Sequence, residues 1–167
     1  PLNLVAGIAV VLDSRGPVFY RQPRVGLFGE PYDIYKIRSM RTDAEAAGQA
    51  VWASENDPRV TRVGRIIRKL RIDELPQLWC VLKGEMSLVG PRPVVRSELP
   101  RYGDQVGYYL MVRPGMTGLW QVSGRNDVDY DTRVYLDSWY VKNWSLWHDL
   151  VILFKTVSVV LSRQGAY

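Results

Sequence analysis

Two apolar segments, one at each end of the chain, most constrain what this sequence can fold into. The first, residues 1–12, reads PLNLVAGIAVVL. As a helix it would reach only about 18 Å, whereas the hydrocarbon core of a membrane is about 30 Å thick. The second runs from Trp139 to Leu161 and is interrupted by Asp149 and Lys155. Neither segment is predicted to span a membrane. For the first, a buried core helix and a membrane-dipping segment both remain open.

The second segment has the periodicity of a helix with one apolar face. Its apolar residues recur at helical spacing: Trp147, Leu150, Val151, Phe154, Val157 and Leu161. Tryptophan and tyrosine with lysine and arginine near the ends of such a helix are typical of one that lies among lipid head groups. An ordinary core helix explains the same pattern equally well, so both interpretations stay open.

Composition narrows the possible partners. The chain has 167 residues, a net charge of +5 and one cysteine, Cys80. This length supports one domain with a real core, and a single cysteine excludes a disulfide framework or a cysteine-rich zinc site. A reducing, cytosol-facing compartment is therefore expected. The basic residues are mostly arginine, which suits phosphate recognition. Nucleic acid, an anionic membrane surface and a phosphorylated small molecule are the candidate partners.

The spacing of apolar and turn residues predicts one α+β unit without repeats or linkers. Lys36 and Arg38 are expected on one face of the second of two strands. Asp127 or Asp129 is expected to cap the helix near the end of the chain. The predicted elements are two extended segments within 17–40 around a turn at 27–31, a mobile loop at 42–58, helices from 61, from 76 to 84 and from 130 to 142, and turns at 90–93, 114–118 and 123–126.

Two adjacent carboxylates, Asp73 and Glu74, lie between an arginine-rich helix and the start of the next one. Carboxylates at a helix start are often only caps. Here, however, Arg92, Arg113 and Arg125 follow in later turns of the chain. Two further basic residues, Lys36 and Arg38, precede the carboxylates. A pair of acids among so many phosphate-binding bases favours a site for a metal-bound diphosphate.

Five ordered motifs carry a resemblance to a known family. They are PVFYRQPRVG (17–26), KIRSM (36–40), DELPQLW (73–79), VLKGEMSLVGPRP (81–93) and RPGMTGLWQVSGR (113–125). Together they closely resemble the bacterial sugar transferases, the monotopic phosphoglycosyl transferases that start surface polysaccharides such as O-antigen and exopolysaccharide. The resemblance covers the whole chain, and the closing residues QGAY (164–167) look most like the members that transfer galactose 1-phosphate.

The resemblance implies transfer of a hexose 1-phosphate from a UDP-sugar to undecaprenyl phosphate, with release of UMP. In such enzymes Mg²⁺ assists an Asp-Glu pair, so Asp73 would be the nucleophile that forms an aspartyl-phosphosugar, and Glu74 would hold the metal. The residues implied to contact substrate or support the site are Lys36, Arg38, Arg92, Arg113, Arg125 and Asp137.

The family also implies a location and a domain layout. Residues 1–12 would be the second half of a re-entrant membrane helix, and residues 13–167 a single catalytic domain with amphipathic interfacial helices. The enzyme would lie on the cytoplasmic face of the inner membrane, with no nucleic-acid partner, and a homo-oligomer is left open. Relatives usually carry Asn where this chain has Cys80, which we expect to be a small buried residue. His148 is the only histidine, and we expect it at an interface.

Elementary electrostatics explains why such a site would need positive charge to offset the repulsion between a carboxylate and a diphosphate. A carboxyl with an ordinary pKa of about 3.9 is roughly 99.9% ionised at pH 7, so Asp73 would need no general base. Repulsion is the obstacle, because two like charges ~4 Å apart cost about 4 kcal/mol at an effective dielectric of about 20. A non-catalytic basic module, with Arg62, Arg65 and Arg68 as its patch, and a phosphodiesterase that hydrolyses UDP-sugars are the alternatives.

Overall fold

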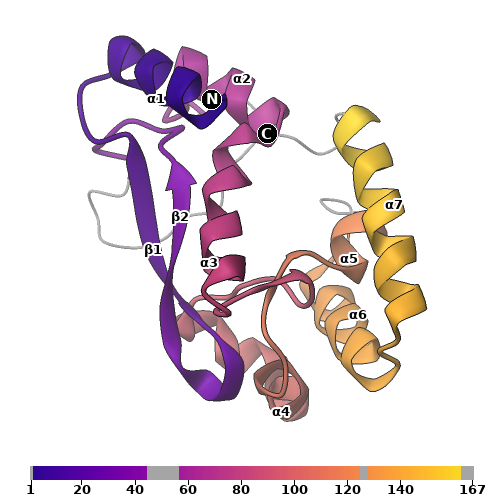
Figure 1. The fold of residues 1–167 in the computed structure, drawn as a ribbon. Coiled ribbons are helices and arrows are strands. Elements are labelled where there is room, and N and C mark those ends of the chain that lie inside the picture. The colour runs from indigo at the N-terminus through magenta and orange to yellow at the C-terminus, as the bar shows by residue number, and fades with distance from the viewer. Residues whose placement is uncertain (1, 45–56, 125–127, 163–167) are drawn as a thin grey trace. The chain divides into compact units, whose positions relative to one another are not determined.

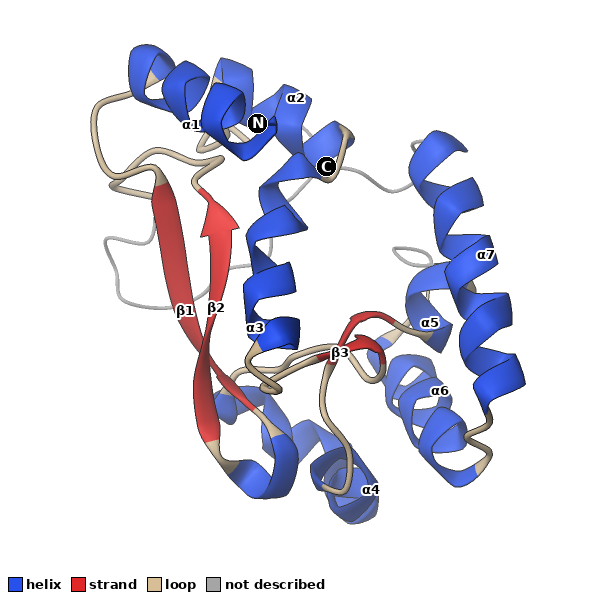
Figure 2. Ribbon diagram, in the orientation of Figure 1, coloured by secondary structure: helices blue, strands red, loops and turns tan. Residues whose placement is uncertain are grey.

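The computed structural model describes residues 2–44, 57–124 and 128–162 (Figure 1). Helices predominate over two small two-stranded sheets, so the predicted α+β class is confirmed (Figure 2). The chain divides into two compact units. Unit 1 comprises Pro1–Arg21, Tyr35–Pro76 and Arg163–Tyr167, and unit 2 comprises Gln22–Ile34 and Gln77–Ser162. The segments of the two units alternate along the chain, so the division does not correspond to one boundary in the sequence. The predicted boundary between residues 12 and 13 stays a prediction.

A β-hairpin forms where the sequence predicted two extended segments. Strand β1 spans Phe19–Val25 and strand β2 spans Pro31–Ile37, and they pair in one sheet. The short 3₁₀ turn η1, Leu27–Gly29, joins them. This turn contains Phe28 at φ 57° beside Gly29 at φ 84°, a tight reversal that needs the left-handed region.

Unit 1 is built around two helices, α1 (Leu2–Asp13) and α2 (Arg62–Lys69). Their core cluster contains Ala6, Val10, Ile37 and Ile67. Thr61 caps α2, since its hydroxyl accepts a hydrogen bond from the Gly64 amide at 2.9 Å. Both helices were predicted.

Only some of the apolar side chains of α2 enter this core. Ile67 is buried and Val63 packs against the cluster, whereas Ile66 and Leu70 are exposed. The helix also needs a glycine, because a Cβ on Gly64 would lie 1.9 Å from the carbonyl oxygen of Ser39. The helix after it begins as the 3₁₀ turn η2, Ile72–Gln77.

Unit 2 holds a parallel pair of very short strands that the sequence did not reveal. Strand β3 (Ser87–Val89) pairs with β4 (Gly115–Thr117) in the register Ser87↔Gly115 and Val89↔Thr117. Residues 114–118 were predicted only as a turn. The other elements are α3 (Leu78–Leu82), η3 (Arg96–Gln105), α4 (Val106–Leu110), α5 (Leu119–Val122), α6 (Tyr130–Lys142) and α7 (Leu146–Ser162).

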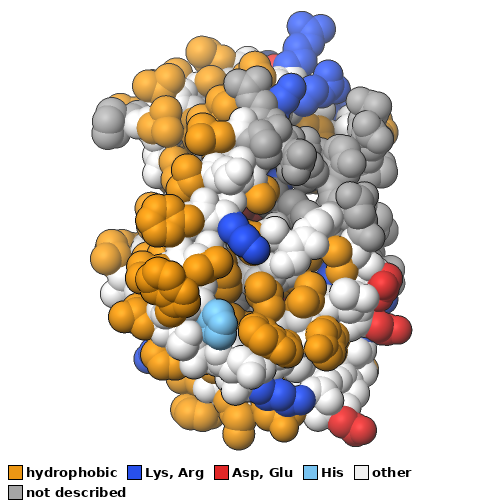
Figure 3. Space-filling model, turned by 90° about the vertical axis from the view of Figure 1, so that its right-hand side faces the viewer, with side chains coloured by type: hydrophobic (Ala, Val, Ile, Leu, Met, Phe, Trp, Pro, Cys, Tyr) orange, Lys and Arg blue, Asp and Glu red, His pale blue; other side chains and the backbone are white. Residues whose placement is uncertain are grey.

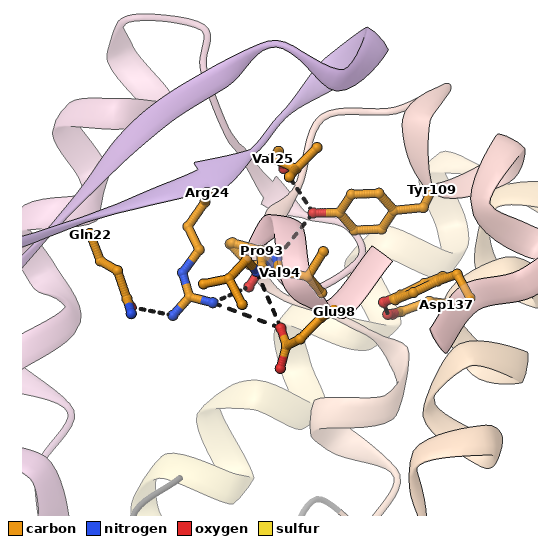
Figure 4. Close-up of polar contacts among 10 residues, drawn as sticks. Gln22, Arg24, Val25, Pro93, Val94, Glu98, Tyr109 and Asp137 are labelled. Carbon is orange, nitrogen blue, oxygen red and sulfur yellow. Dashed lines mark hydrogen bonds and ion pairs between the residues drawn. The ribbon is translucent and has the colours of Figure 1, made fainter. Parts of the chain in front are cut away.

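A buried tyrosine ties the hairpin end of unit 2 to the segment after β3. The Tyr109 hydroxyl donates to the Val25 carbonyl at 2.8 Å and accepts from the Val94 amide at 3.1 Å (Figure 4). Val25, Val94 and Tyr109 belong to one core cluster with Tyr102 and Val134. One side chain thus satisfies two buried backbone groups.

The α7 helix exposes most of the apolar stripe predicted for it. Trp147 is 71% exposed and Phe154 is 78% exposed, whereas the core contact is made by Ile152 against Val89 and Tyr140. Hydrophobic side chains gather on the face that carries α7 (Figure 3). The plain core-helix interpretation therefore explains only the inner side of α7. No helix among the described residues is long and apolar enough to cross a membrane, as predicted.

Candidate active site

The end of α2 places Asp73 and Glu74 at the start of the next turn. After the helix, Arg71 adopts φ 58°, the left-handed conformation that usually ends a helix with glycine. In a residue with a side chain this conformation costs about 1–2 kcal/mol. The chain then reverses into η2, whose first turn contains both carboxylates.

Lys36 forms an ion pair with one of these two carboxylates inside unit 1. The Lys36 ammonium lies 3.0 Å from the Glu74 carboxylate, and both side chains are about 28–29% exposed. Asp73 is buried, at 7% exposure, and its Oδ1 atom has no hydrogen-bond partner in the described part of the chain. The structure thus brings together three of the predicted residues, Lys36, Asp73 and Glu74.

Burial changes the chemistry expected of Asp73. Desolvation, and then the Glu74 charge, raise its pKa to about 6, against the opposing effects of Lys36, Arg68 and Arg71. The sequence had suggested an ordinary pKa. At pH 7 about nine in ten of these carboxyls are still ionised, so a nucleophilic carboxylate without a general base remains feasible. The higher pKa also makes it a stronger nucleophile than a solvated aspartate.

Arg38 binds the chain rather than lying open at the site. Its guanidinium donates to the Pro17 carbonyl at 2.7 Å, to the Ser14 hydroxyl at 2.6 Å and to the Ser14 carbonyl at 2.7 Å. The residue is 5% exposed and follows the end of β2 at Ile37. These bonds give it a role in holding the segment after α1, and a substrate contact by Arg38 stays a prediction.

The other described candidates lie in unit 2. Asp137 on α6 is 2% exposed, accepts a hydrogen bond from the Tyr102 hydroxyl at 2.9 Å and interacts with the backbone amide of Arg92. Arg113 is exposed and donates to the Gly84 carbonyl at 2.6 Å. Arg125 lies outside the described residues. Asp137 is thus placed to support the turn that contains Arg92.

A second arginine fixes the far side of that turn (Figure 4). The Arg24 guanidinium donates to the Pro93 carbonyl at 3.3 Å, contacts the Glu98 carboxylate at 4.0 Å and bonds to Gln22. Buried backbone and side-chain groups thus hold the Gly90–Pro93 turn from two directions. A rigid turn is what a substrate-binding arginine needs.

The chemistry of the Asp73–Glu74 pair is compatible with Mg²⁺. Among the described residues there is no group of three or more His, Cys, Asp or Glu that could hold a metal ion. Mg²⁺ is commonly bound by one or two carboxylates, with the phosphates of the substrate and water completing its coordination. The Oδ1 atom of buried Asp73, which has no hydrogen-bond partner among the described residues, and the neighbouring Glu74 carboxylate fit that donor set.

Three arginines that bear on these sites were not predicted from the sequence: Arg71, Arg101 and Arg133. Arg71 acts on the charge of Asp73, as does Arg68, and Arg92 and Arg101 act on the charge of Arg133. One signal was available. Arg133 precedes Asp137 by four residues in a predicted helix, which places both on one face. The reversal at Arg71 had no comparable signal, because arginine is not a usual residue for positive φ.

Cys80 lies where it was expected, whereas the position of His148 at an interface stays a prediction. Cys80 is fully buried, and its thiol lies 3.4 Å from the Asp33 carbonyl, so it is the small buried residue predicted. His148 is half-buried, with its Nδ1 atom 2.8 Å from the Asn143 carbonyl and its ring against Trp139. These contacts join α7 to the end of α6.

With the fold and these side chains in view, the comparisons with known proteins define the class. Residues 1–163 match the model of the family described as bacterial sugar transferase, and the chain belongs to this family, as the sequence motifs indicated. A curated relative is the undecaprenyl-phosphate galactose phosphotransferase of Salmonella typhimurium, 57% identical over 181 residues, covering 100% of this chain and 38% of the relative.

Two further relatives show the range of the family. The UDP-galactose-lipid carrier transferase of Erwinia amylovora is 56% identical over 180 residues, covering 98% of this chain and 37% of its own length. The exopolysaccharide production protein ExoY of Rhizobium meliloti is 47% identical over 181 residues, with 100% and 80% covered. The chain therefore spans less than two fifths of the first two relatives and most of the third.

Proposed function

We propose that this chain is the catalytic part of a sugar-1-phosphate transferase that moves galactose 1-phosphate from UDP-galactose to undecaprenyl phosphate and releases UMP. The observation that carries the proposal is the buried Asp73 carboxylate beside Glu74 and Lys36. Support for the sugar comes from two relatives whose names specify galactose. Another relative is named as an N-acetylgalactosamine phosphotransferase, so the sugar has to be tested.

The proposed reaction has two displacements at one phosphorus. In the first, an Asp73 carboxylate oxygen attacks the sugar-bearing phosphorus of the UDP-sugar, and the bond from that phosphorus to the oxygen of the UMP phosphate breaks. UMP leaves, and an aspartyl-phosphosugar remains. In the second, an oxygen of the lipid phosphate attacks the same phosphorus, and the bond to Asp73 breaks. The products are a polyprenyl-diphosphate sugar and a free carboxylate on Asp73.

The protein contributes the charges for these steps. Lys36 offsets part of the negative charge of the carboxylate pair and thereby eases the approach of a diphosphate. Glu74 would hold Mg²⁺ together with the Asp73 oxygen that has no hydrogen-bond partner in the part of the chain that the structure describes. The ion would supply positive charge against the phosphate oxygens. The burial of Asp73 keeps water from a carboxylate that must attack phosphorus.

A place at the membrane surface completes the proposal. A lipid acceptor requires it, and the exposed apolar faces of α1 and α7 suit it. On α1 Leu4 is 70% and Leu12 is 82% exposed, although Val10 on its other side is buried. We infer that α7 lies at the interface and that α1 is the second half of a re-entrant helix, on the cytoplasmic face of the inner membrane.

The test uses the purified protein with undecaprenyl phosphate in detergent micelles and UDP-galactose, UDP-glucose or UDP-N-acetylgalactosamine. Repeated turnover, measured as UMP release beyond one equivalent per enzyme, should depend on Mg²⁺ and on the lipid, and all UMP release should be lost in Asp73→Asn. Omission of the lipid should leave a hexose-phosphate adduct on Asp73, detectable by intact mass and peptide mapping. Asp43→Asn is the matched control, because this carboxylate is exposed at the surface of the same unit and pairs with Arg41.

Other outcomes separate the remaining hypotheses. Turnover of Asp73→Asn at the wild-type rate would refute the mechanism. Release of free sugar phosphate without a lipid acceptor would indicate the phosphodiesterase. Salt-dependent vesicle or DNA binding that ignores UDP-sugar and Mg²⁺, with no turnover, would indicate the basic module, for which the comparisons give no support.

A further inference from the structure

Three arginines from three different elements gather around two aromatic rings in unit 2. Arg92 lies in the turn after β3, with its guanidinium carbon 5.7 Å from the centroid of the Trp120 ring. Arg133, from the first turns of α6, lies 4.8 Å from the same ring. Arg101 in η3 lies 3.5 Å from the centroid of the Tyr130 ring. We call these five residues the arginine–aromatic cluster.

The charges of this cluster repel one another. Burial, and then the charge of Arg92, lower the pKa of Arg133, and Arg101 acts in the same direction. Glu98 opposes this effect on Arg133, and the buried Asp137 faces Arg92. Burial raises the pKa of Asp137 to about 7. The oxygens of a phosphate placed among the three guanidinium groups would reduce their mutual repulsion.

The rings hold the guanidinium groups in place and remove water from their faces. Trp120 is buried, at 4% exposure, so its indole is a fixed platform. A guanidinium stacked on a ring keeps its N–H groups in its own plane, and that planar fork matches the oxygens of a phosphate. Arg133 is further fixed by its Nε donating to the Val128 carbonyl at 3.0 Å. Arg101 is exposed and accessible to a ligand.

We propose that Arg92, Arg101 and Arg133 form a phosphate-binding site on the Trp120 and Tyr130 rings, which takes a phosphate monoester or a diphosphate. The ligand could be supplied by the nucleotide or by the lipid phosphate, and both offer the same dianionic head. Only this choice of ligands rests on the proposed function. The binding of a phosphate by the cluster does not require that transfer occurs.

Isothermal titration at fixed ionic strength tests the site with four probes: UMP, UDP, inorganic pyrophosphate and farnesyl phosphate. We expect Arg101→Gln and Arg133→Gln each to weaken at least one probe tenfold or more. Arg96→Gln is the matched control, since Arg96 is an exposed arginine at the start of η3, and it should change affinity less than twofold. Weakening confined to UMP and UDP identifies the nucleotide, and weakening confined to farnesyl phosphate identifies the lipid.

Unchanged affinity for all four probes in both variants would overturn the proposal. Arg133→Lys covers the case in which the glutamine variants do not fold. This variant keeps the positive charge but lacks the planar set of guanidinium N–H donors. Pyrophosphate should raise the melting temperature of the wild type, and this rise should be mostly absent in Arg133→Lys. A full rise in Arg133→Lys counts against the site.

A further variant separates this site from the proposed reaction. Asp73→Asn should lose transfer yet keep phosphate affinity within twofold if the cluster is the binding site. If the wild-type protein shows no transfer but the arginine substitutions still weaken phosphate binding, the proposed function fails and the phosphate site stands.

Discussion

Replacement of buried Asp137 by asparagine should change how the stability of this protein depends on pH. The carboxyl is 2% exposed, and burial raises its pKa to about 7, against the hydrogen bond from Tyr102 and the nearby Arg92, from a reference value of 3.8. The folded state therefore holds this proton more tightly than the unfolded state does. The contribution of Asp137 to the free energy of unfolding should be highest at low pH and fall as pH rises from about 4 to about 7.

The magnitude follows from the two pKa values. The difference between 3.8 and about 7 corresponds to about 4 kcal/mol over the full range, at 1.36 kcal/mol per pKa unit. Between pH 5 and pH 8 about 2.5 kcal/mol of it should appear. Asp137→Asn lacks this titration but replaces one oxygen acceptor by an NH₂ group facing the Arg92 amide, which should cost about 1–3 kcal/mol at every pH.

The assay is urea unfolding of wild type and variant at intervals from pH 5 to pH 8, followed by circular dichroism. The free energy of unfolding of Asp137→Asn minus that of the wild type should rise by about 2.5 kcal/mol across this range. Asp104→Asn, an exposed carboxyl of the same unit, controls for the substitution itself. A difference that is flat with pH, or that falls, would refute the argument that burial governs this carboxyl.

Substitutions at four further positions test the packing and the α6 cap by urea unfolding. Gly64→Ala should destabilise by several kcal/mol, because its Cβ would lie 1.9 Å from a backbone oxygen, whereas Gly107→Ala, with open space in α4, should stabilise by about 0.5–1 kcal/mol. Asp129→Ala should cost about 1 kcal/mol through loss of the α6 cap, and Asp129→Asn should retain most of it; equal losses would argue against capping. Tyr109→Phe should cost about 2–4 kcal/mol, because it leaves a buried amide and a buried carbonyl without their hydroxyl partner, and a loss below 0.5 kcal/mol would contradict that.

Local signals in the sequence were enough for the longer elements. The cap of α6 was predicted as Asp127 or Asp129, and it is Asp129; the end of the helix at Lys142 was also predicted, since capping and helical spacing act within a few residues. The hairpin was also predicted from its turn residues. By contrast, β3 and β4 have three residues each, too few for alternation to show, and their pairing joins residues 28 positions apart, as in Ser87 and Gly115.

The candidate site was predictable in its residue types but not in its electrostatics. Motifs identified Asp73 and Glu74, and the structure brings Lys36 to them, although the roles of all three stay predictions. The raised pKa of Asp73 arises from burial, which depends on how the chain reverses at Arg71. A property of the folded environment leaves no local pattern in the sequence.

The arginines show most clearly why residue type alone does not assign a function. Arginine is a common phosphate-binding residue, yet the Arg38 guanidinium is buried against the Ser14 and Pro17 carbonyls. Arg24 likewise donates to the backbone, at the Pro93 carbonyl. These groups replace water with backbone oxygens, which ties distant segments of the chain together. Arg101 instead lies on an aromatic ring at the surface, where the ring cannot neutralise its charge. The surroundings of each guanidinium therefore decide its role. A guanidinium surrounded by carbonyl oxygens holds the chain together, whereas one that lies among aromatic rings and other cations is suited to bind an anion.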